Sequence, residues 1–97
     1  MSKDKKLRSE AMDLLFEGML KLRSVDECYA YFEDLCTVAE MRAMAQRFEV
    51  AKNLSDGMTY MQIENSVGVS AATISRVKTA LEDGADGYKL VLERMKK

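Results

Sequence analysis

The chain has 97 residues, of which 47% are hydrophobic and 32% charged, and its formal net charge is −1. This length and composition predict one small globular domain rather than a disordered chain. Histidine is absent, which excludes histidine-based triads, general bases and zinc ligands, so we expect neither a catalytic nor a metal site. No apolar run approaches the roughly 20 residues of a membrane span, and the charged N-terminus lacks a signal peptide's apolar segment. We therefore expect a cytoplasmic protein that is not an enzyme.

Helix-capping chemistry marks four helix starts. Ser24 and Thr37 each stand three residues before a glutamate, and Thr59 stands three residues before Gln62, which is the spacing of a capping box. Ser70 is a simpler N-cap. Glycine-containing stretches at 56–57, 68 and 84–87 predict helix ends. The result is an all-α fold with helices over about 5–23, 25–35, 38–55, 60–66, 71–82 and 86–96.

The first predicted helix is apolar around most of its circumference. Its apolar arc covers roughly 240°, against the ~100° stripe of an ordinary surface helix. One interpretation buries this helix between two neighbours of the same chain; the other, which we favour, buries it in an interlocked homodimer. The arc comprises Leu7, Ala11, Met12, Leu14, Leu15, Phe16, Gly18, Met19, Leu20 and Leu22.

Charge is segregated along the chain. Residues 10–40 carry eight acidic and two basic side chains, whereas residues 41–81 carry five basic and three acidic ones. A pI near 5.5 argues against non-specific coating of nucleic acid. It is compatible with a local DNA-binding patch, because only charges within about a Debye length of the phosphates contribute strongly.

The segment 58–78 has the spacing of a helix-turn-helix. Ile63 and Val67 lie four residues apart on the inner face of a short first helix. Gly68 permits the tight turn that follows, since a left-handed backbone costs glycine little. Val69 is expected to fill the space between the two helices.

The second helix of this motif has an apolar inner face and a small, polar outer face. Ile74, Val77 and Leu81 are spaced to be buried, which leaves short side chains and hydroxyls pointing outward. Small residues allow close approach to the DNA major groove. We expect Ala71, Ala72, Thr73 and Ser75 to contact bases, and Tyr60, Ser70, Arg76 and Lys78 to contact phosphates.

Two blocks of sequence together resemble the Trp repressor family, and more closely its YerC/YecD-type branch. They are Leu35–Arg47 (LCTVAEMRAMAQR) and the helix-turn-helix from Met58 to Leu81. The resemblance covers most of the chain from about Leu14. It implies six helices per subunit in an intertwined dimer, with the fourth and fifth helices reading DNA. The two recognition helices would then lie about one DNA turn, roughly 34–36 Å, apart.

The resemblance also implies a small-molecule effector pocket. The positions that match the family's ligand-binding residues are Thr37, Arg47, Thr73 and Arg76, and an arginine suits a ligand carboxylate. Val77 stands where tryptophan-responsive members have glycine, and Ala80 where they have serine. A β-branched side chain would fill part of the indole site, so we expect tryptophan not to bind and leave any effector unassigned.

The sequence thus predicts a single Trp repressor-like domain over residues 1–97, with its helix-turn-helix at about 58–82. We expect a dimeric, sequence-specific transcriptional regulator, a repressor by resemblance, that binds a double-stranded DNA operator without a cofactor. The alternative is a protein-interaction module that retains the fold but does not read DNA. The acidic segment 10–40 favours that alternative.

Overall fold

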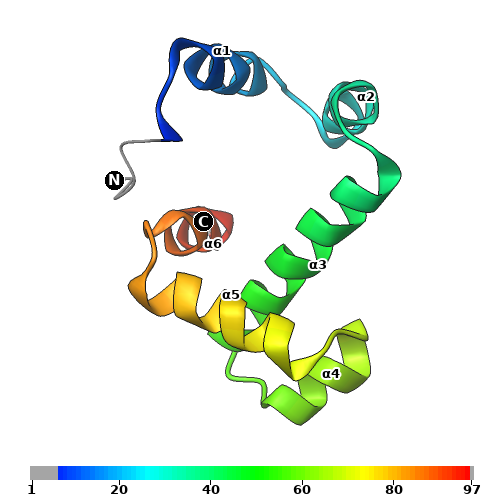
Figure 1. Cartoon of the computed structure of the whole chain (residues 1–97), viewed down its shortest axis with the longest axis vertical. Coiled ribbons are helices and arrows are strands. Elements are labelled where there is room, and N and C mark those ends of the chain that lie inside the picture. Colours follow the sequence, from blue (N-terminus) through cyan, green and yellow to red (C-terminus); the bar gives the residue numbers. More distant parts are fainter. Residues whose placement is uncertain (1–6, 97) are drawn as a thin grey trace. The chain divides into compact units, whose positions relative to one another are not determined.

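The computed structural model describes residues 7–96, which form six helices and no strand (Figure 1). The helices are α1 (Glu10–Met19), α2 (Val25–Leu35), α3 (Val38–Ser55), α4 (Tyr60–Val67), α5 (Ala71–Asp83) and α6 (Gly87–Met95). The all-α prediction is confirmed. The chain divides into two compact units at the boundary between Met41 and Arg42, within α3. No helix in residues 7–96 is long and apolar enough to cross a membrane.

The first helix is shorter than the predicted span of 5–23, of which residues 5 and 6 lie outside the described part. It begins after Ser9, whose hydroxyl accepts a hydrogen bond from the Met12 amide at 3.0 Å. It ends at Met19, because the amides of Lys21 and Leu22 donate to carbonyls only three residues back. Such bonds tighten the last turn and stop an α-helix.

The predicted capping boxes at Thr37 and Thr59 are confirmed. The Thr37 amide donates to Glu40 Oε1 at 2.8 Å and the Glu40 amide donates to Thr37 Oγ1 at 3.1 Å. The hydrogen bond from the Thr37 amide, with a smaller contribution from its hydroxyl, lowers the pKa of Glu40 below its ordinary value of 4.5. Thr59 and Gln62 exchange the same two hydrogen bonds at the start of α4.

The capping box predicted at Ser24 is only half formed. The Glu27 amide donates to the Ser24 hydroxyl at 3.1 Å, but the Glu27 carboxylate accepts from the amide of Arg23 instead of that of Ser24. The backbone φ at Ser24 is −151°, against −76° at Thr59, so a different amide meets the carboxylate. The start of α2 is still capped, because the free Glu27 amide is paired with the Ser24 hydroxyl in either arrangement.

The unit from Arg42 onward has a hydrophobic core built by all four of its helical segments. Its buried residues are Val50 and Ala51 from α3, Ile63 from α4, Ile74 and Val77 from α5, and Leu92 from α6. Helix α4 packs on α5, and α5 packs on α6. The inner faces predicted for the helix-turn-helix are therefore confirmed, with Val67, Val69 and Leu81 half-buried around this core.

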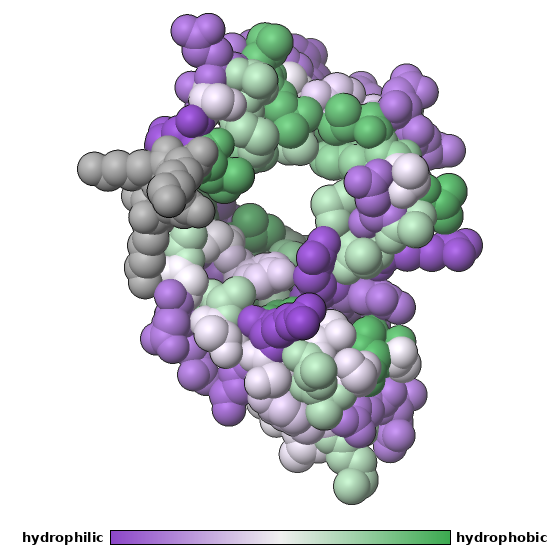
Figure 2. Space-filling model, in the orientation of Figure 1, coloured by the Kyte–Doolittle hydropathy of each residue, from purple (hydrophilic) through white to green (hydrophobic). Residues whose placement is uncertain are grey.

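The unit that contains α1 and α2 has no comparable core. Neither helix contains a buried residue, and large apolar side chains lie at the surface, with Leu14 69% and Leu20 84% exposed. Figure 2 shows hydrophobic side chains at the surface of both helices. Within its own unit, the apolar arc predicted for the first helix therefore stays at the surface.

The connection between α5 and α6 depends on a glycine at position 84. A methyl group there would overlap the carbonyl oxygen of Ala80, which is backbone and cannot move aside. We expect Gly84→Ala to destabilise the protein by about 1–3 kcal/mol. A methyl group at Gly87 meets nothing within 4 Å. Gly87→Ala should therefore stabilise by roughly 0.5–1 kcal/mol through the unfolded state.

Urea unfolding followed by circular dichroism, at one protein concentration, checks both changes. Gly87→Ala is the matched control, because it adds the same methyl group in the same connection. Equal midpoints for the two variants would contradict the steric argument.

Candidate nucleic-acid interface

The turn between α4 and α5 has the local geometry that the sequence predicts for a helix-turn-helix. Gly68 has φ 79° and ψ 35°, a left-handed conformation, and its amide closes α4 by donating to the Glu64 carbonyl at 3.0 Å. Ser70 then caps α5 by accepting a hydrogen bond from the Thr73 amide at 3.3 Å. These two caps fix where α4 ends and where α5 begins. Ile63 from α4 and Ile74 from α5 belong to the same hydrophobic core.

The outer face of α5 consists of Ala71, Ala72, Ser75 and Lys78, and all four residues are exposed. Three of them carry no more than one heavy atom beyond Cβ, and they lie along the first half of the helix. Ile74 and Val77 are buried on a different face of α5, and the four residues of the outer face are open to solvent. An α-helix with short side chains along one face fits into the DNA major groove.

Lys78 is held in place by a residue from the other helix of the motif. Its ammonium lies 5.8 Å from the centroid of the Tyr60 ring at the start of α4, within the range of a cation–π interaction. The Lys78 Nζ also lies 3.9 Å from Glu82 Oε1, one turn further along α5. Two residues predicted to contact phosphates, Tyr60 and Lys78, are thus brought together.

The hydroxyls of Ser70 and Thr73 lie 3.3 Å apart and interact with each other. Ser70 is exposed and Thr73 is half-buried, so the two differ in their access to an external partner. Thr73 lies on the flank of α5, whereas Ser75 lies on its outer face.

A small cavity of about 210 Å³ lies between α3 and α5. It brings together most of the residues predicted for an effector pocket, since Arg47, Thr73, Arg76 and Val77 all line it. Thr37 belongs to the other unit, where its hydroxyl caps α3. Sequence reasoning missed the remaining lining residues, Ala43 and Gln46. Ala43 could have been predicted, because it lies four residues before Arg47 and therefore on the same face of α3. Gln46 directly precedes Arg47, and helical spacing does not place it on that face.

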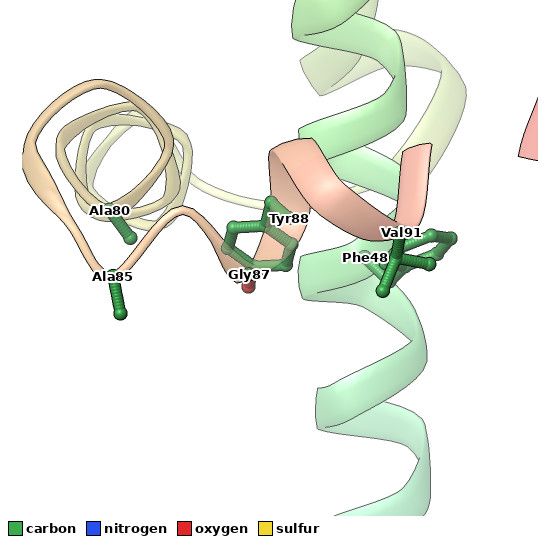
Figure 3. Close-up of a pocket in the computed structure, with 6 residues that line it drawn as sticks. All are labelled: Phe48, Ala80, Ala85, Gly87, Tyr88 and Val91. Carbon is green, nitrogen blue, oxygen red and sulfur yellow. The ribbon is translucent and has the colours of Figure 1, made fainter. Parts of the chain in front are cut away.

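A second, open cavity of about 520 Å³ lies among α3, α5 and α6 (Figure 3). Phe48 from α3 and Tyr88 from α6 form its aromatic part, with ring centroids 6.3 Å apart. Ala80 lines this cavity, and not the one that contains the two arginines. The full lining is Phe48, Ala80, Ala85, Gly87, Tyr88 and Val91. No sequence pattern indicated it, because an open apolar hollow depends on how three helices cross.

Comparison with known proteins places the chain in one family. The family model described as Trp repressor protein matches residues 10–96. The chain is 50% identical over 91 residues to the uncharacterised protein YerC of Bacillus subtilis (strain 168), covering 94% of this chain and 88% of YerC.

Two crystal structures have the same fold. A proposed Trp repressor from Staphylococcus aureus has a TM-score of 0.92 and 47% identity, over 99% of this chain and 96% of that one. A TrpR-like protein from Eubacterium eligens ATCC 27750 has a TM-score of 0.92 and 46% identity, over 96% of each chain. The chain belongs to the Trp repressor family, which is a family of regulators rather than of enzymes.

Proposed function

We propose that this chain is a sequence-specific DNA-binding transcriptional regulator that acts as a dimeric repressor. The observation that carries the proposal is the outer face of α5, which is exposed, lined by small residues and ends in a positioned lysine. Ala71, Ala72 and Ser75 contact base edges in the major groove. Repression follows when the bound protein occupies a promoter.

The phosphate contacts of the proposal come from residues around that face. Lys78 and Tyr60 contact the DNA backbone together. Ser70 contacts it near the start of α5, and Arg76 contacts it from the flank of that helix. Such contacts position a protein on the duplex and make binding depend on salt. Thr73, half-buried beside Ser70, reads a base only after its hydroxyl exchanges partners.

The dimer in this proposal covers apolar surface that the unit of α1 and α2 leaves open by itself. Helices α1 and α2 have no buried residue, and Leu14, Leu20, Val25 and Tyr29 are each more than half exposed. Exposed apolar surface on this scale marks an interaction site rather than a free surface. The apolar cavity among α3, α5 and α6 (Figure 3) offers a complementary hollow to a second copy.

The proposal includes no cofactor and no response to tryptophan. The α3–α5 cavity has a volume of about 210 Å³. Val77, 3% exposed, is part of its wall and of the core. Arg47 and Arg76 equip the cavity for an anionic effector of unassigned identity.

Selection of genomic DNA fragments on the purified chain, with and without tryptophan, tests the proposal. Enrichment of one short near-palindrome in both samples is the expected result, since two related recognition helices read two half-sites. Enrichment only with tryptophan would overturn the argument from Val77. Absence of enrichment in both would favour a protein-interaction module instead.

Two substitutions on α5 separate phosphate contacts from base contacts. Lys78→Ala should weaken binding to all sequences and make the salt dependence shallower by about one unit of log–log slope per recognition helix. Ser75→Ala should change the preferred site at one position, with discrimination altered by about 0.5–1.5 kcal/mol, the contribution of one neutral hydrogen bond. Binding titrations on the selected duplex and on a scrambled one distinguish the two effects. Circular dichroism is the folding control, since loss of structure in both variants would mean that this face is not the interface.

A further inference from the structure

The recognition helix carries an acidic residue in line with its outer face. Residues 71, 75, 78 and 82 fall on one side of a helix, because about 100° separates successive residues. Glu82 therefore continues the row formed by Ala71, Ser75 and Lys78. Its side chain is 57% exposed, and its carboxylate lies 3.9 Å from the Lys78 ammonium.

Helix stability does not account for this placement. Glu82 lies in the last turn of α5, where no basic residue is present and where the negative end of the helix dipole disfavours a carboxylate. The order of the pair, with lysine before glutamate, is also the weaker one for residues four apart. An exposed pair in this orientation contributes little to folding.

The pair does affect the cation that the proposed function assigns to phosphate. The Lys78 ammonium lies near both the Tyr60 ring and the Glu82 carboxylate, and the Lys78 side chain remains 49% exposed. A DNA phosphate that approaches the ammonium must replace the carboxylate as its counter-ion. It must also approach the negative charge of Glu82 itself.

We infer that Glu82 competes with DNA phosphate for Lys78 and so limits the affinity of α5 for DNA of any sequence. This inference rests on the proposed function. Its consequence is a lower affinity for non-specific DNA, since sequence-independent affinity comes almost entirely from phosphate contacts. Contacts from Ala71 and Ser75 to base edges are unaffected, so the ratio of specific to non-specific occupancy is preserved at a lower absolute affinity.

The test is a double-mutant cycle on a mixed-sequence duplex of about 30 base pairs, followed by fluorescence anisotropy between roughly 50 and 200 mM salt. Glu82→Gln should raise affinity roughly two- to fivefold per recognition helix. It should also make the salt dependence steeper. In the Lys78→Ala background the same change should give a smaller gain, because only the direct repulsion between Glu82 and phosphate is then relieved.

Asp56→Asn is the matched control. It removes a carboxylate from an exposed pair of the same spacing, Lys52–Asp56 at 2.9 Å, which lies at the end of α3 rather than on α5. It should leave the affinity unchanged. An equal gain from Glu82→Gln with and without Lys78, or no gain at all, would overturn the inference while wild-type binding upheld the proposed function. If wild-type protein bound neither this duplex nor any selected fragment, both would fall.

Discussion

Ile74→Ala should lower the free energy of unfolding by about 2–5 kcal/mol. The side chain of Ile74 is fully buried and belongs to the hydrophobic cluster to which α3, α4, α5 and α6 all contribute. Truncation removes apolar contacts and leaves a cavity that the surrounding helices cannot fill completely. Since domains of this kind are stable by only about 5–15 kcal/mol, a large share of the stability would be lost.

Urea unfolding at a single protein concentration measures this effect, because the stability of an oligomer varies with concentration. Met61→Ala is the control, since Met61 lies on α4 in the same motif but is 72% exposed. It should change stability by no more than about 0.5 kcal/mol. A difference below about 1 kcal/mol between Ile74→Ala and wild type would show that the core is not organised around α5.

Leu14→Glu should convert the proposed dimer into a monomer. Leu14 lies on α1 and is 69% exposed, and the exposed apolar residues Phe16 on the same helix and Leu20 at its C-cap lie nearby in the sequence. A carboxylate buried without a partner costs several kcal/mol, which exceeds what one residue contributes to an ordinary interface. Loss of the dimer would also remove high-affinity binding to a two-part operator, because each helix-turn-helix would then bind its half-site alone.

Sedimentation velocity over a concentration series gives the oligomeric state directly. Leu14→Met is the matched control and should remain dimeric, since it keeps an apolar side chain of similar volume. If wild type is dimeric and Leu14→Glu sediments in the same way, α1 lies outside the interface. A monomeric wild type would contradict the dimer as a whole.

Local interactions explain why most helix boundaries were predictable. The starts of α3, α4 and α5 depend on Thr37, Thr59 and Ser70, each of which interacts with an amide three residues away. The end of α4 depends on the left-handed conformation of Gly68. The error in the first helix has the same origin, because its N-cap, Ser9, lies inside a charged and apolar run that concealed it.

The candidate site was predictable to the extent that it follows from helical periodicity. Burial of Ile63, Ile74 and Val77 leaves Ala71, Ala72, Ser75 and Lys78 exposed, and a period of 3.6 residues requires this division. Helical periodicity also places Glu82 on the same side of α5 as Ser75 and Lys78. The distance between the Glu82 carboxylate and the Lys78 ammonium depends on side-chain rotamers, so periodicity could not predict it.

The sequence by itself determined the number of helices, the caps of α3, α4 and α5, and the buried faces of α4 and α5, because these features depend on residues within about one turn of each other. The tertiary structure decided which side chains from different helices meet. It brought Arg47 to Arg76 across the α3–α5 cavity, set Tyr60 against Lys78, and directed Ala80 into a separate apolar hollow. These contacts between helices depend on the angles and distances at which the helices pack. The core of Val50, Ile63 and Ile74 sets those angles and distances, and no local sequence pattern encodes them.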